Sequence, residues 1–517
     1  MVISSLKKDK AAGPDNLVPI LFKEGGCHLV MEITKLLGLI WETETVPISW
    51  GESIVIPLFK KGSRVLCENH RGISLTPVIT RIVASIILNR LKQARDSTTR
   101  EEQAGFRPGR GCIDQIFTLR QLLEQRHTYR RPTIAVFLDF KGAFDSVDRK
   151  ALFQTLCRRG LPDKYVNILK SLYSHTTGSV RAYGRCSKTF DTKSGVRQGC
   201  PLSPFLFNFI IDEIMEDCVT RSPSSGIELG SFEDLVDLDY ADDIVMLFDS
   251  SEKAQHMLNT VSGSILPFGM RFAPAKCKVL LQNCDDYTDL SLSGEVLEVV
   301  SSFTYLGSCI SNDGGVDSEI HARIGKARAA FSKLRHLWRE KGVSERLKGR
   351  VYEAAVRTVL LYGCETWPVR TEDLKRLQAF DHRCLRYIAG IHWAHKVNNE
   401  EVRTRVLGNG VKSLAYAMRR HKLRWLGHVL RMPDHRLPKR VLLAQPASGW
   451  RKARGGQKMT WQRDMKKMTE GLGRVGVNRL PGWGAKDTSL NWFCTLSDMA
   501  SNRNQWRECC RVLAESF

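Results

Sequence analysis

The 517-residue sequence has no long uninterrupted apolar segment. Its longest candidate, PFLFNFIIDEIM at 204–215, is broken by Asp212 and Glu213, whereas a membrane-spanning helix needs about 18 to 20 apolar residues in a row. The first residues, MVISSLKKDKAAGPD, also lack the apolar core of a secretory signal peptide. The sequence therefore predicts a protein that does not span a membrane and is not secreted.

Cysteine pairs of the Cys-x₂-Cys type are missing as well, although the chain has 15 cysteines. A structural zinc site normally uses such an anchor, and His421 and His428, about 10 Å apart along a helix, could not share one ion. Scattered cysteines without a secretory signal fit a reducing compartment, where they serve mostly as small hydrophobic residues. We therefore expect no structural zinc, despite five further candidate ligands: Cys364, His382, Cys384, His392 and His395.

Acidic residues are scarce relative to basic ones. The chain carries 78 Lys and Arg against 55 Asp and Glu, a net charge of +23, which favours a nucleic-acid partner over the weaker alternative of an anionic membrane surface. Residues 401–470 alone contain 18 basic and 4 acidic residues, and nine of the 11 tryptophans follow residue 330. The C-terminal third is thus a distinct basic, tryptophan-rich region.

Three aspartates lie at the ends of strongly apolar segments. TIAVFLDF (133–140) predicts a strand buried on both faces, with Asp139 at its end, and DLVDLDYADDIVMLFDS (234–250) predicts a β-hairpin with Asp242 and Asp243 near its bend. An unpaired carboxylate there is costly to desolvate, so such charges persist where a cation neutralises them. Carboxylates on adjacent strands can hold two Mg²⁺ ions roughly 3.5 to 4 Å apart, the arrangement of two-metal phosphoryl transfer.

Periodicity and turn residues predict the other elements. SIVIPLFKKG (53–62) predicts a strand, and 76–93 and 114–130 have helical spacing. One helix is expected from 141 to Gly160, and another begins near Pro201 to Pro204, where proline suits a first turn. Beyond 311 the pattern is helical through about residue 440, and the Gly, Pro and basic content of 441–487 predicts loops.

Three motifs resemble those of a known protein family. FLDFKGAFDSVDR, SGVRQGCPLSPFLFN and YADD, in that order, resemble the core motifs of reverse transcriptases, in the form found in non-long-terminal-repeat (non-LTR, LINE-type) retrotransposons. The resemblance covers roughly residues 10 to 440 and implies an α+β fold of the right-hand polymerase type. It implies an N-terminal segment and fingers at 1–132, a palm with motifs A to E at 133–312 (some fingers residues interleaved), a helical thumb at 313–400, and a helical, basic, Trp-rich extension at 401–517.

An endonuclease domain commonly precedes the polymerase in such proteins. Because this sequence begins inside the first polymerase segment, we expect that domain to be missing. The missing part would leave primer extension possible but not the nicking of a target site.

The resemblance also assigns a catalytic centre. Asp139 and Asp242 match the residues that coordinate the catalytic metals, and Asp243 is the second acid of the Tyr-x-Asp-Asp turn that begins at Tyr240. The two ions are expected to be Mg²⁺, with Mn²⁺ as a substitute. Lys276, in GMRFAPAKCKVL, matches a lysine able to protonate the departing pyrophosphate, which is a general-acid role.

Nucleotide-binding residues follow from the same motifs. Phe144, five residues after Asp139, matches the aromatic steric gate that rejects a 2′-hydroxyl, and a core aromatic is the alternative. Gln198 and Gly199 match the motif that contacts the incoming nucleotide and the template, where glycine allows close backbone approach.

Fixed cations on the fingers must bind the triphosphate. Arg71, in ENHRGISL, matches the family's arginine, although His70 and Gly72 replace its usual tyrosine and proline. Lys60 or Lys61 is the second expected cation, and the sequence does not choose between them.

Template and primer contacts are implied at three places. Arg107, in QAGFRPGRG, resembles a template-contacting arginine, with a solvated loop charge as the alternative. Arg424 and Trp425, in RRHKLRWLGHVLRM (419–432), would suit single-stranded or hybrid nucleic acid through phosphate neutralisation and stacking, and the alternative places Trp425 in a core. FTYLGSCIS resembles the hairpin that grips the primer end, through Tyr305, Leu306 and Gly307.

The implied function is that of an RNA-directed DNA polymerase acting by two-metal phosphoryl transfer. Its partners would be an RNA template, a DNA primer or RNA–DNA hybrid, and deoxynucleoside triphosphates; a nuclear location with cytoplasmic synthesis follows from the family, and the oligomeric state is not set. Two alternatives stay open: a catalytically inactive nucleic-acid-binding remnant and a group II intron maturase. The intact acids argue against the first, and a maturase-type RNA-binding segment is not recognised after the thumb.

Overall fold

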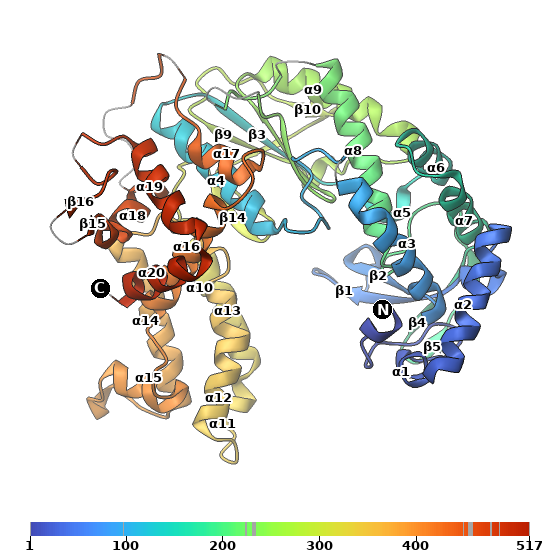
Figure 1. The fold of residues 1–517 in the computed structure, drawn as a ribbon, viewed down its shortest axis with the longest axis horizontal. Coiled ribbons are helices and arrows are strands. Elements are labelled where there is room, and N and C mark those ends of the chain that lie inside the picture. The colour runs from blue at the N-terminus through green and yellow to red at the C-terminus, as the bar shows by residue number, and fades with distance from the viewer. Residues whose placement is uncertain are drawn as a thin grey trace.

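The computed structural model describes residues 1–517 except 1, 97, 223–224, 230–233, 448, 453–458, 476–477, 485 and 516–517. In Figure 1 the central sheet around β3 (Thr133–Leu138) lies at the top and the N-terminal part lies on the right. The helices between 317 and 407 extend downward on the left, beside the C-terminal helices. The N-terminal and C-terminal parts thus flank the sheet that carries the three aspartates.

A five-stranded sheet forms the palm, in the order β12-β9-β3-β8-β7. Neighbouring strands are antiparallel except for the edge pair β12–β9, which is parallel. All residues of β3 are buried, as predicted for a central strand covered on both faces. The remaining strands are β7 (Asp237–Tyr240), β8 (Asp243–Phe248), β9 (Lys278–Gln282) and β12 (Glu298–Val300).

Side chains of β3 alternate between two hydrophobic cores, with the period of two that a strand imposes. Val136 lies in the core beneath α8 (Ser203–Arg221) and α9 (Ser251–Ser264), whereas Phe137 lies in the core beneath α4 (Cys112–Thr128). The helices expected near 76–93, at 114–130 and from Pro201 to Pro204 are confirmed by α3 (Val78–Asp96), α4 and α8.

A second sheet of five strands supports the fingers. β1 (Glu52–Phe59) pairs antiparallel with β2 (His70–Leu75) and parallel with β4 (Thr177–Ala182). Strands from 52–75 and from 177–191, far apart in the sequence, therefore share one sheet. The other elements of this part are β5 (Arg185–Cys186), β6 (Phe190–Asp191), α1 (Pro19–Glu24), α2 (Gly26–Thr43) and α7 (Asp163–Ser174).

The single helix expected at 141–160 is wrong. α5 (Ala143–Ser146) ends at Val147, whose φ of −51° and ψ of 124° are not helical, and α6 (Arg149–Arg158) starts after Asp148, which caps it through Ala151 N–H. Val147 is fully buried, and its carbonyl accepts a hydrogen bond from Gly195 N–H. A tertiary contact therefore interrupts the helical periodicity at this point.

A hairpin at the end of the palm leads into the helical thumb. β13 (Ser302–Tyr305) pairs with β14 (Ser308–Ser311). The hydrophobic core that contains Trp367 of the thumb also includes Val402 and Leu414, beyond residue 400. The helices are α10 (Asp317–Lys333), α11 (Arg335–Arg339), α12 (Glu345–Tyr352), α13 (Thr358–Leu360), α14 (Thr371–Ile388) and α15 (Asn399–Leu407).

The described residues of 441–487 include a helix where we expected loops, and 448, 453–458, 476–477 and 485 lie outside the described residues. Within that range α18 (Trp461–Met468) buries Trp461 completely against Phe117 of α4. Both carboxylate oxygens of Glu124, also on α4, accept a hydrogen bond from Trp461 N–H, at 3.0 and 2.8 Å. Burial raises the pKa of Glu124 to about 8. The other helices are α16 (Leu414–Leu430), α17 (Leu437–Leu443), α19 (Ser489–Ser501) and α20 (Arg503–Glu515).

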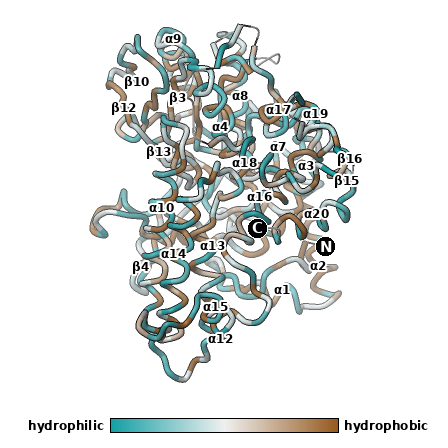
Figure 2. Tube along the Cα trace, turned by 90° about the vertical axis from the view of Figure 1, so that its left-hand side faces the viewer, coloured by the Kyte–Doolittle hydropathy of each residue, from teal (hydrophilic) through white to brown (hydrophobic). Residues whose placement is uncertain are grey.

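The C-terminal helices lie between the palm and the end of the thumb. Figures 1 and 2 both place α16 and α20 at a height between the palm helix α9 and the thumb helices α12 and α15. Their core includes Phe117 of α4, so this region packs on the palm as well. In the described part of the chain, no helix combines the length and the apolar composition that a membrane span requires.

Candidate active site

Asp139 and the acidic turn meet at one edge of the palm sheet. Leu138 lies opposite Ile244 in the β3–β8 pair, so Asp139 at the end of β3 lies beside Asp243 at the start of β8. Tyr240 and Asp243 close the β7–β8 hairpin, and Ala241 in its turn has a left-handed φ of 59°. The hairpin predicted from the sequence is therefore present, with both acids at its bend.

Desolvation and mutual repulsion perturb the acids of this turn. The Asp243 side chain reaches solvent, but partial desolvation, followed by repulsion from Asp242 and Asp139, raises its pKa to about 6. Burial raises the pKa of Asp242, with Asp139 adding to the effect and Arg71 opposing it. The three carboxylates interact although their oxygens do not all lie within 4.8 Å of one another. A bound divalent cation would relieve the repulsion, and carboxylate oxygens are ligands that Mg²⁺ prefers.

Lys276 lies next to the first of these acids. Its Nζ is 3.3 Å from Asp139 Oδ1. The short helical turn that carries it is held to the end of β3, because Ala273 N–H donates to the Asp139 carbonyl and Phe272 stacks on Phe140 with ring centroids 4.8 Å apart. Lys276 thus lies beside Asp139, at the same edge of the palm sheet as the acidic turn.

The fingers hairpin presents one lysine and one arginine toward the acids. Arg71 lies opposite Leu58 in the β1–β2 pair, and Lys60 N–H donates to the Asn69 carbonyl. Lys60 and Arg71 are the two charges that oppose the upward shift, caused by desolvation, in the pKa of Asp145. Both also act on Asp242. Between the two lysines that the sequence left open, the structure favours Lys60.

Gly199 and Gln198 lie against the same hairpin. Gly199 has a φ of 114°, and a Cβ on it would lie 2.8 Å from the Ser74 carbonyl oxygen, so no side chain fits. The Gln198 carbonyl accepts a hydrogen bond from Ser74 N–H at 2.6 Å, and its side-chain amide is 3.4 Å from Asp145 Oδ2. The motif therefore fixes the palm to the fingers beside the acids.

Phe144 packs on one side against the palm helix α8. Its ring stacks on Phe207 of α8 with centroids 4.7 Å apart, as a core aromatic would. The side chain is only half-buried, so part of it stays accessible beside the active-site acids.

Tyr305, in the 302–311 hairpin, does not lie where a primer contact would require it. Tyr305 is only 2% exposed, and its hydroxyl donates to the Leu238 carbonyl of β7. Its expected contact with a primer is therefore corrected to a core role, because its side chain faces the palm. Leu306 and Gly307 form the bend, with positive φ values of 46° and 82°, and Gly307 is exposed.

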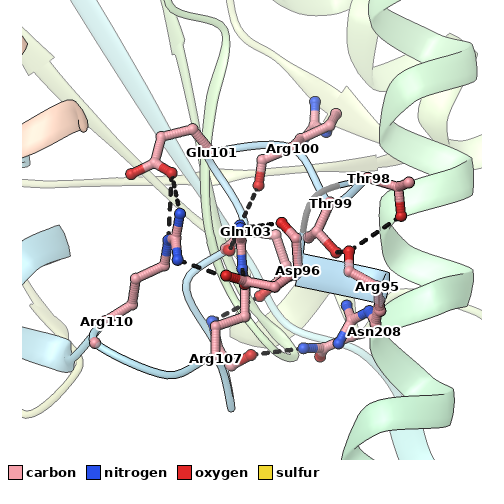
Figure 3. A network of polar contacts seen from close by, with 12 residues as sticks. Arg95, Asp96, Thr98, Thr99, Arg100, Glu101, Gln103, Arg107, Arg110 and Asn208 are labelled. Carbon is pink, nitrogen blue, oxygen red and sulfur yellow. Dashed lines mark hydrogen bonds and ion pairs between the residues drawn. The ribbon is translucent and has the colours of Figure 1, made fainter. Parts of the chain in front are cut away.

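Arg107 is likewise corrected from a template contact to a structural residue. Its guanidinium is buried, and it donates to Asp96 Oδ1 and to the carbonyls of Arg100 and Gln103. Figure 3 shows Arg107 and Arg110 turned toward Asp96 and Glu101 at the base of the loop. The cation therefore satisfies the loop's own acceptors rather than pointing at a ligand.

Gln103 is a positioning residue that the sequence analysis did not identify. Its buried side-chain oxygen accepts hydrogen bonds from Ala241 N–H at 3.1 Å and from Gly105 N–H at 2.9 Å. The loop passes so close to the catalytic turn that a Cβ on Gly105 would lie 2.4 Å from Ala241 N. The only signal in the sequence was a glutamine directly before a pair of small residues in QAGF.

A buried charge cluster anchors β7 from beneath and was also missed. Arg100 pairs with Asp237, with Asp239 at 3.1 Å and with Asp212 at 3.5 Å, and all three acids are buried. Desolvation, followed by repulsion from Asp237, raises the pKa of Asp239 well above its usual value. The alternating acids of DLVDLDY were visible in the sequence, but their partner 137 residues upstream was not.

Arg424 and Trp425 lie on different faces of the helix that carries them. Arg424 is exposed, whereas Trp425 lies in the C-terminal core with its ring 5.5 Å from that of Phe117. Lys422 on the same helix is buried and pairs with Asp464. Stacking of a nucleic-acid base on Trp425 is therefore corrected to core packing.

An antiparallel palm with an acidic turn, cationic fingers and a helical thumb defines the right-hand polymerase fold. Residues 59–310 match the family described as "Reverse transcriptase (RNA-dependent DNA polymerase)". Over this segment the chain is similar to reverse transcriptases, and its relatives are named as RNA-directed DNA polymerases of mobile elements. The α+β right-hand fold predicted from the motifs is thereby confirmed.

Several relatives support this assignment. The chain is 25% identical to "Probable RNA-directed DNA polymerase from transposon BS" of Drosophila melanogaster, over 75% of this chain and 43% of that protein. It is 22% identical to "RNA-directed DNA polymerase from mobile element jockey" of the same species, over 80% of this chain and 46% of that protein. The chain thus spans less than half the length of these relatives. A solved telomerase of Candida tropicalis is 14% identical, with a TM-score of 0.39 over 79% of this chain and 74% of that one.

Proposed function

We propose that this chain is an RNA-directed DNA polymerase that adds deoxynucleotides to a primer 3′-hydroxyl. The observation that carries the proposal is the β3–β8 register, which puts Asp139 beside Asp243. Their repulsion, added to desolvation, raises the pKa of Asp243 to about 6. Acids held in this way, on a reverse transcriptase domain, are suited to phosphoryl transfer rather than to structural support.

We propose Mg²⁺ as the ion, with Mn²⁺ as a substitute, bound by Asp139, Asp242 and Asp243. Hard carboxylate oxygens with no sulfur or imidazole among them fit these ions. Two bound ions would neutralise charge on the attacking and leaving oxygens. Because Lys276 pairs with Asp139 in this structure, the lysine would release the carboxylate when the ions bind.

The chain's own groups would bind and orient the nucleotide. Lys60 and Arg71 act electrostatically on Asp145 and Asp242, so a triphosphate held between fingers and palm would meet both cations. Phe144 would stand beneath the sugar as the steric gate. Lys276 Nζ carries the proton proposed for the departing pyrophosphate.

Nucleic acid would run past the palm toward the thumb. We propose that the exposed bend at Gly307 meets the primer end and that Arg424 contacts a phosphate of the RNA template or hybrid. The net charge of +23 supports a polyanionic partner. A nuclear site of action is proposed from the retrotransposon relatives, and imaging of the tagged full chain in cells tests it.

Primer extension tests the proposal directly. We expect the purified chain to extend oligo-dT on poly-rA in the presence of Mg²⁺, and the Asp242→Asn variant to lose this extension. The matched control is Asp249→Asn, which removes an acid after the far end of β8, near Lys253, and should retain extension. If neither the unmutated chain nor the two variants extend the primer, and the chain binds the hybrid tightly and in a salt-sensitive way, the proposal of polymerase activity is overturned. That result would favour the alternative of an inactive nucleic-acid-binding remnant.

A further inference from the structure

Cys364, Glu365 and His421 bring three metal-binding atoms together at the joint between thumb and C-terminal region. Cys364 and Glu365 lie on the short helical turn η7 (Cys364–Thr366), and His421 lies on α16, 57 residues after Cys364. One sulfur, one carboxylate oxygen and one imidazole nitrogen all lie within 4.8 Å of one another. Among the described residues, no other His, Cys, Asp or Glu trio meets this criterion.

Two of the three separations between these atoms match those around a tetrahedral zinc ion. Cys364 Sγ is 3.7 Å from His421 Nδ1, and His421 Nδ1 is 3.4 Å from Glu365 Oε1. Zinc bonds of about 2.3 Å to sulfur and about 2.0 to 2.2 Å to nitrogen or oxygen, at tetrahedral angles, place S and N roughly 3.6 Å apart and N and O roughly 3.4 Å apart. The side chains would need little movement to close on an ion.

The second carboxylate oxygen of Glu365 provides an independent observation. Glu365 Oε2 is buried and makes no hydrogen bond within the part of the chain that the structure describes. A buried carboxylate oxygen without a partner is costly, and a cation beside it removes that cost. Without a metal, the trio therefore leaves one buried carboxylate oxygen unsatisfied.

Solvent reaches the trio from one side. The Cys364 side chain is fully buried and that of Glu365 is 22% exposed, whereas that of His421 is 43% exposed. An ion can therefore enter past the imidazole, and a water molecule can complete the coordination on the same side.

We propose that Cys364, Glu365 and His421 form a zinc-binding site with a water molecule in the fourth position. Binding breaks the Cys364 S–H bond, forms a sulfur–zinc bond and releases the proton to solvent. Thiolate and imidazole favour Zn²⁺ over Mg²⁺, so the site is chemically distinct from the carboxylates of the palm. The expectation of no structural zinc rested on the lack of a Cys-x₂-Cys anchor, and this trio needs none.

The site would join two cores. α16 contributes Leu414 and Met418 to the thumb core and Leu423 and Leu426 to the C-terminal core, and η7 contributes Cys364 to the thumb core. A metal bridge between η7 and the middle of α16 would hold the C-terminal region at a fixed orientation to the thumb. Zn²⁺ should therefore raise the unfolding temperature of the full chain, a readout that requires no polymerase activity.

Metal titration of the full chain tests the proposal. After chelator treatment, we expect Co²⁺ to produce a thiolate charge-transfer absorption that saturates at one ion per chain and disappears when Zn²⁺ is added. The band should be lost in Cys364→Ser and in His421→Asn. It should persist in two controls, Cys384→Ser in the same core and His428→Asn on the same helix, which test whether any buried cysteine or nearby histidine suffices.

X-ray absorption at the zinc edge tests the site in the unmutated chain, so the result does not depend on whether a variant folds. With one equivalent of Zn²⁺ we expect one sulfur neighbour at about 2.3 Å and nitrogen or oxygen neighbours at about 2.0 to 2.2 Å. A shell without sulfur, or with two or more sulfurs, overturns the site. So does a Co²⁺ band that survives in both Cys364→Ser and His421→Asn.

Discussion

The side-chain oxygen of Gln103 accepts a hydrogen bond from the backbone N–H of Ala241, the residue between Tyr240 and the two acids of the turn. Ala241 is held in a left-handed conformation, with a φ of 59°, which costs a non-glycine residue free energy. The amide of Gln103 is thus the support that keeps the strained turn, and with it the direction of both carboxylates, in place.

Replacing Gln103 by leucine should slow catalysis without weakening nucleotide binding. Two buried N–H groups would lose their acceptor at a cost of about 1 to 3 kcal/mol, and the shifted carboxylates should lower kcat by about 10- to 100-fold with little change in KM. Steady-state extension kinetics measure both parameters. Gln121→Leu, a buried glutamine of α4, is the matched control. Equal kcat losses in the two variants would show that Gln103 acts only on stability.

The two neighbouring lysines of the fingers should differ in their effect on nucleotide affinity. Lys60→Ala removes a charge that acts on Asp145 and Asp242, so we expect KM for the deoxynucleotide to rise by about tenfold, the effect of losing about 1.4 kcal/mol. Lys61→Ala should change it less than threefold. A larger rise in Lys61→Ala than in Lys60→Ala would reverse our assignment.

Stability should fall with rising pH through the burial of Glu124. Its pKa is about 8 in the folded chain against 4.5 as its ordinary value, so between these values the folded state holds a proton that the unfolded state has lost. Folding is therefore favoured at low pH, and Glu124 weakens it progressively up to about pH 8. Glu124→Gln removes this dependence and keeps an acceptor for Trp461 N–H. The melting temperature of the variant relative to wild type should rise from pH 5.5 to pH 8, and a constant difference would contradict the buried carboxyl.

Loss of Arg100 should unfold the palm more readily than loss of a surface arginine. Arg100→Met leaves Asp212, Asp237 and Asp239 buried without their shared cation, which we expect to cost about 3 to 5 kcal/mol. Arg158→Met, at a side chain 61% exposed, should cost less than about 0.5 kcal/mol. Urea unfolding of both variants measures the difference. Similar losses in the two would indicate that solvent already screens the cluster.

Substitution of Arg424 should affect binding of the RNA–DNA hybrid, whereas substitution of Trp425 should affect the stability of the fold. Arg424→Ala should weaken hybrid binding and reduce the slope of log affinity against log salt by about 1, as one phosphate contact predicts. Trp425→Ala should instead cost about 3 to 5 kcal/mol of stability, because the indole fills the C-terminal core. Filter binding at several salt concentrations and thermal unfolding distinguish these outcomes. An unchanged salt slope in Arg424→Ala would remove this residue from the interface.

The sequence predicted those parts of the molecule that depend on local pattern. The apolar run ending at Asp139 and the hairpin around Asp242 carry their own periodicity, so their strands and their meeting at a sheet edge were predictable. The helix break at Val147 was not, because it depends on a hydrogen bond from Gly195, 48 positions later in the printed sequence.

Burial of individual charges was the least predictable part of the site. Arg107 looks like a ligand-binding residue in QAGFRPGRG, and only the folded loop reveals that Asp96 and nearby carbonyls occupy its donors. Lys60 and Lys61 are chemically the same in the sequence, and the strand geometry alone separates them. Gln103 carries no charge and matches no motif that we used, so only its contact with Ala241 identifies it.

The placement of β3 in the middle of the palm sheet has a consequence for synthesis. Both of its partners, β8 and β9, lie more than 100 residues further along the chain. At a synthesis rate of about 5 to 20 residues per second, this largely apolar strand is made roughly 5 to 20 seconds before either partner. During that interval both of its edges are open to association with other chains. The strand that supplies Asp139 is therefore also the segment on which a nascent chain most needs a chaperone.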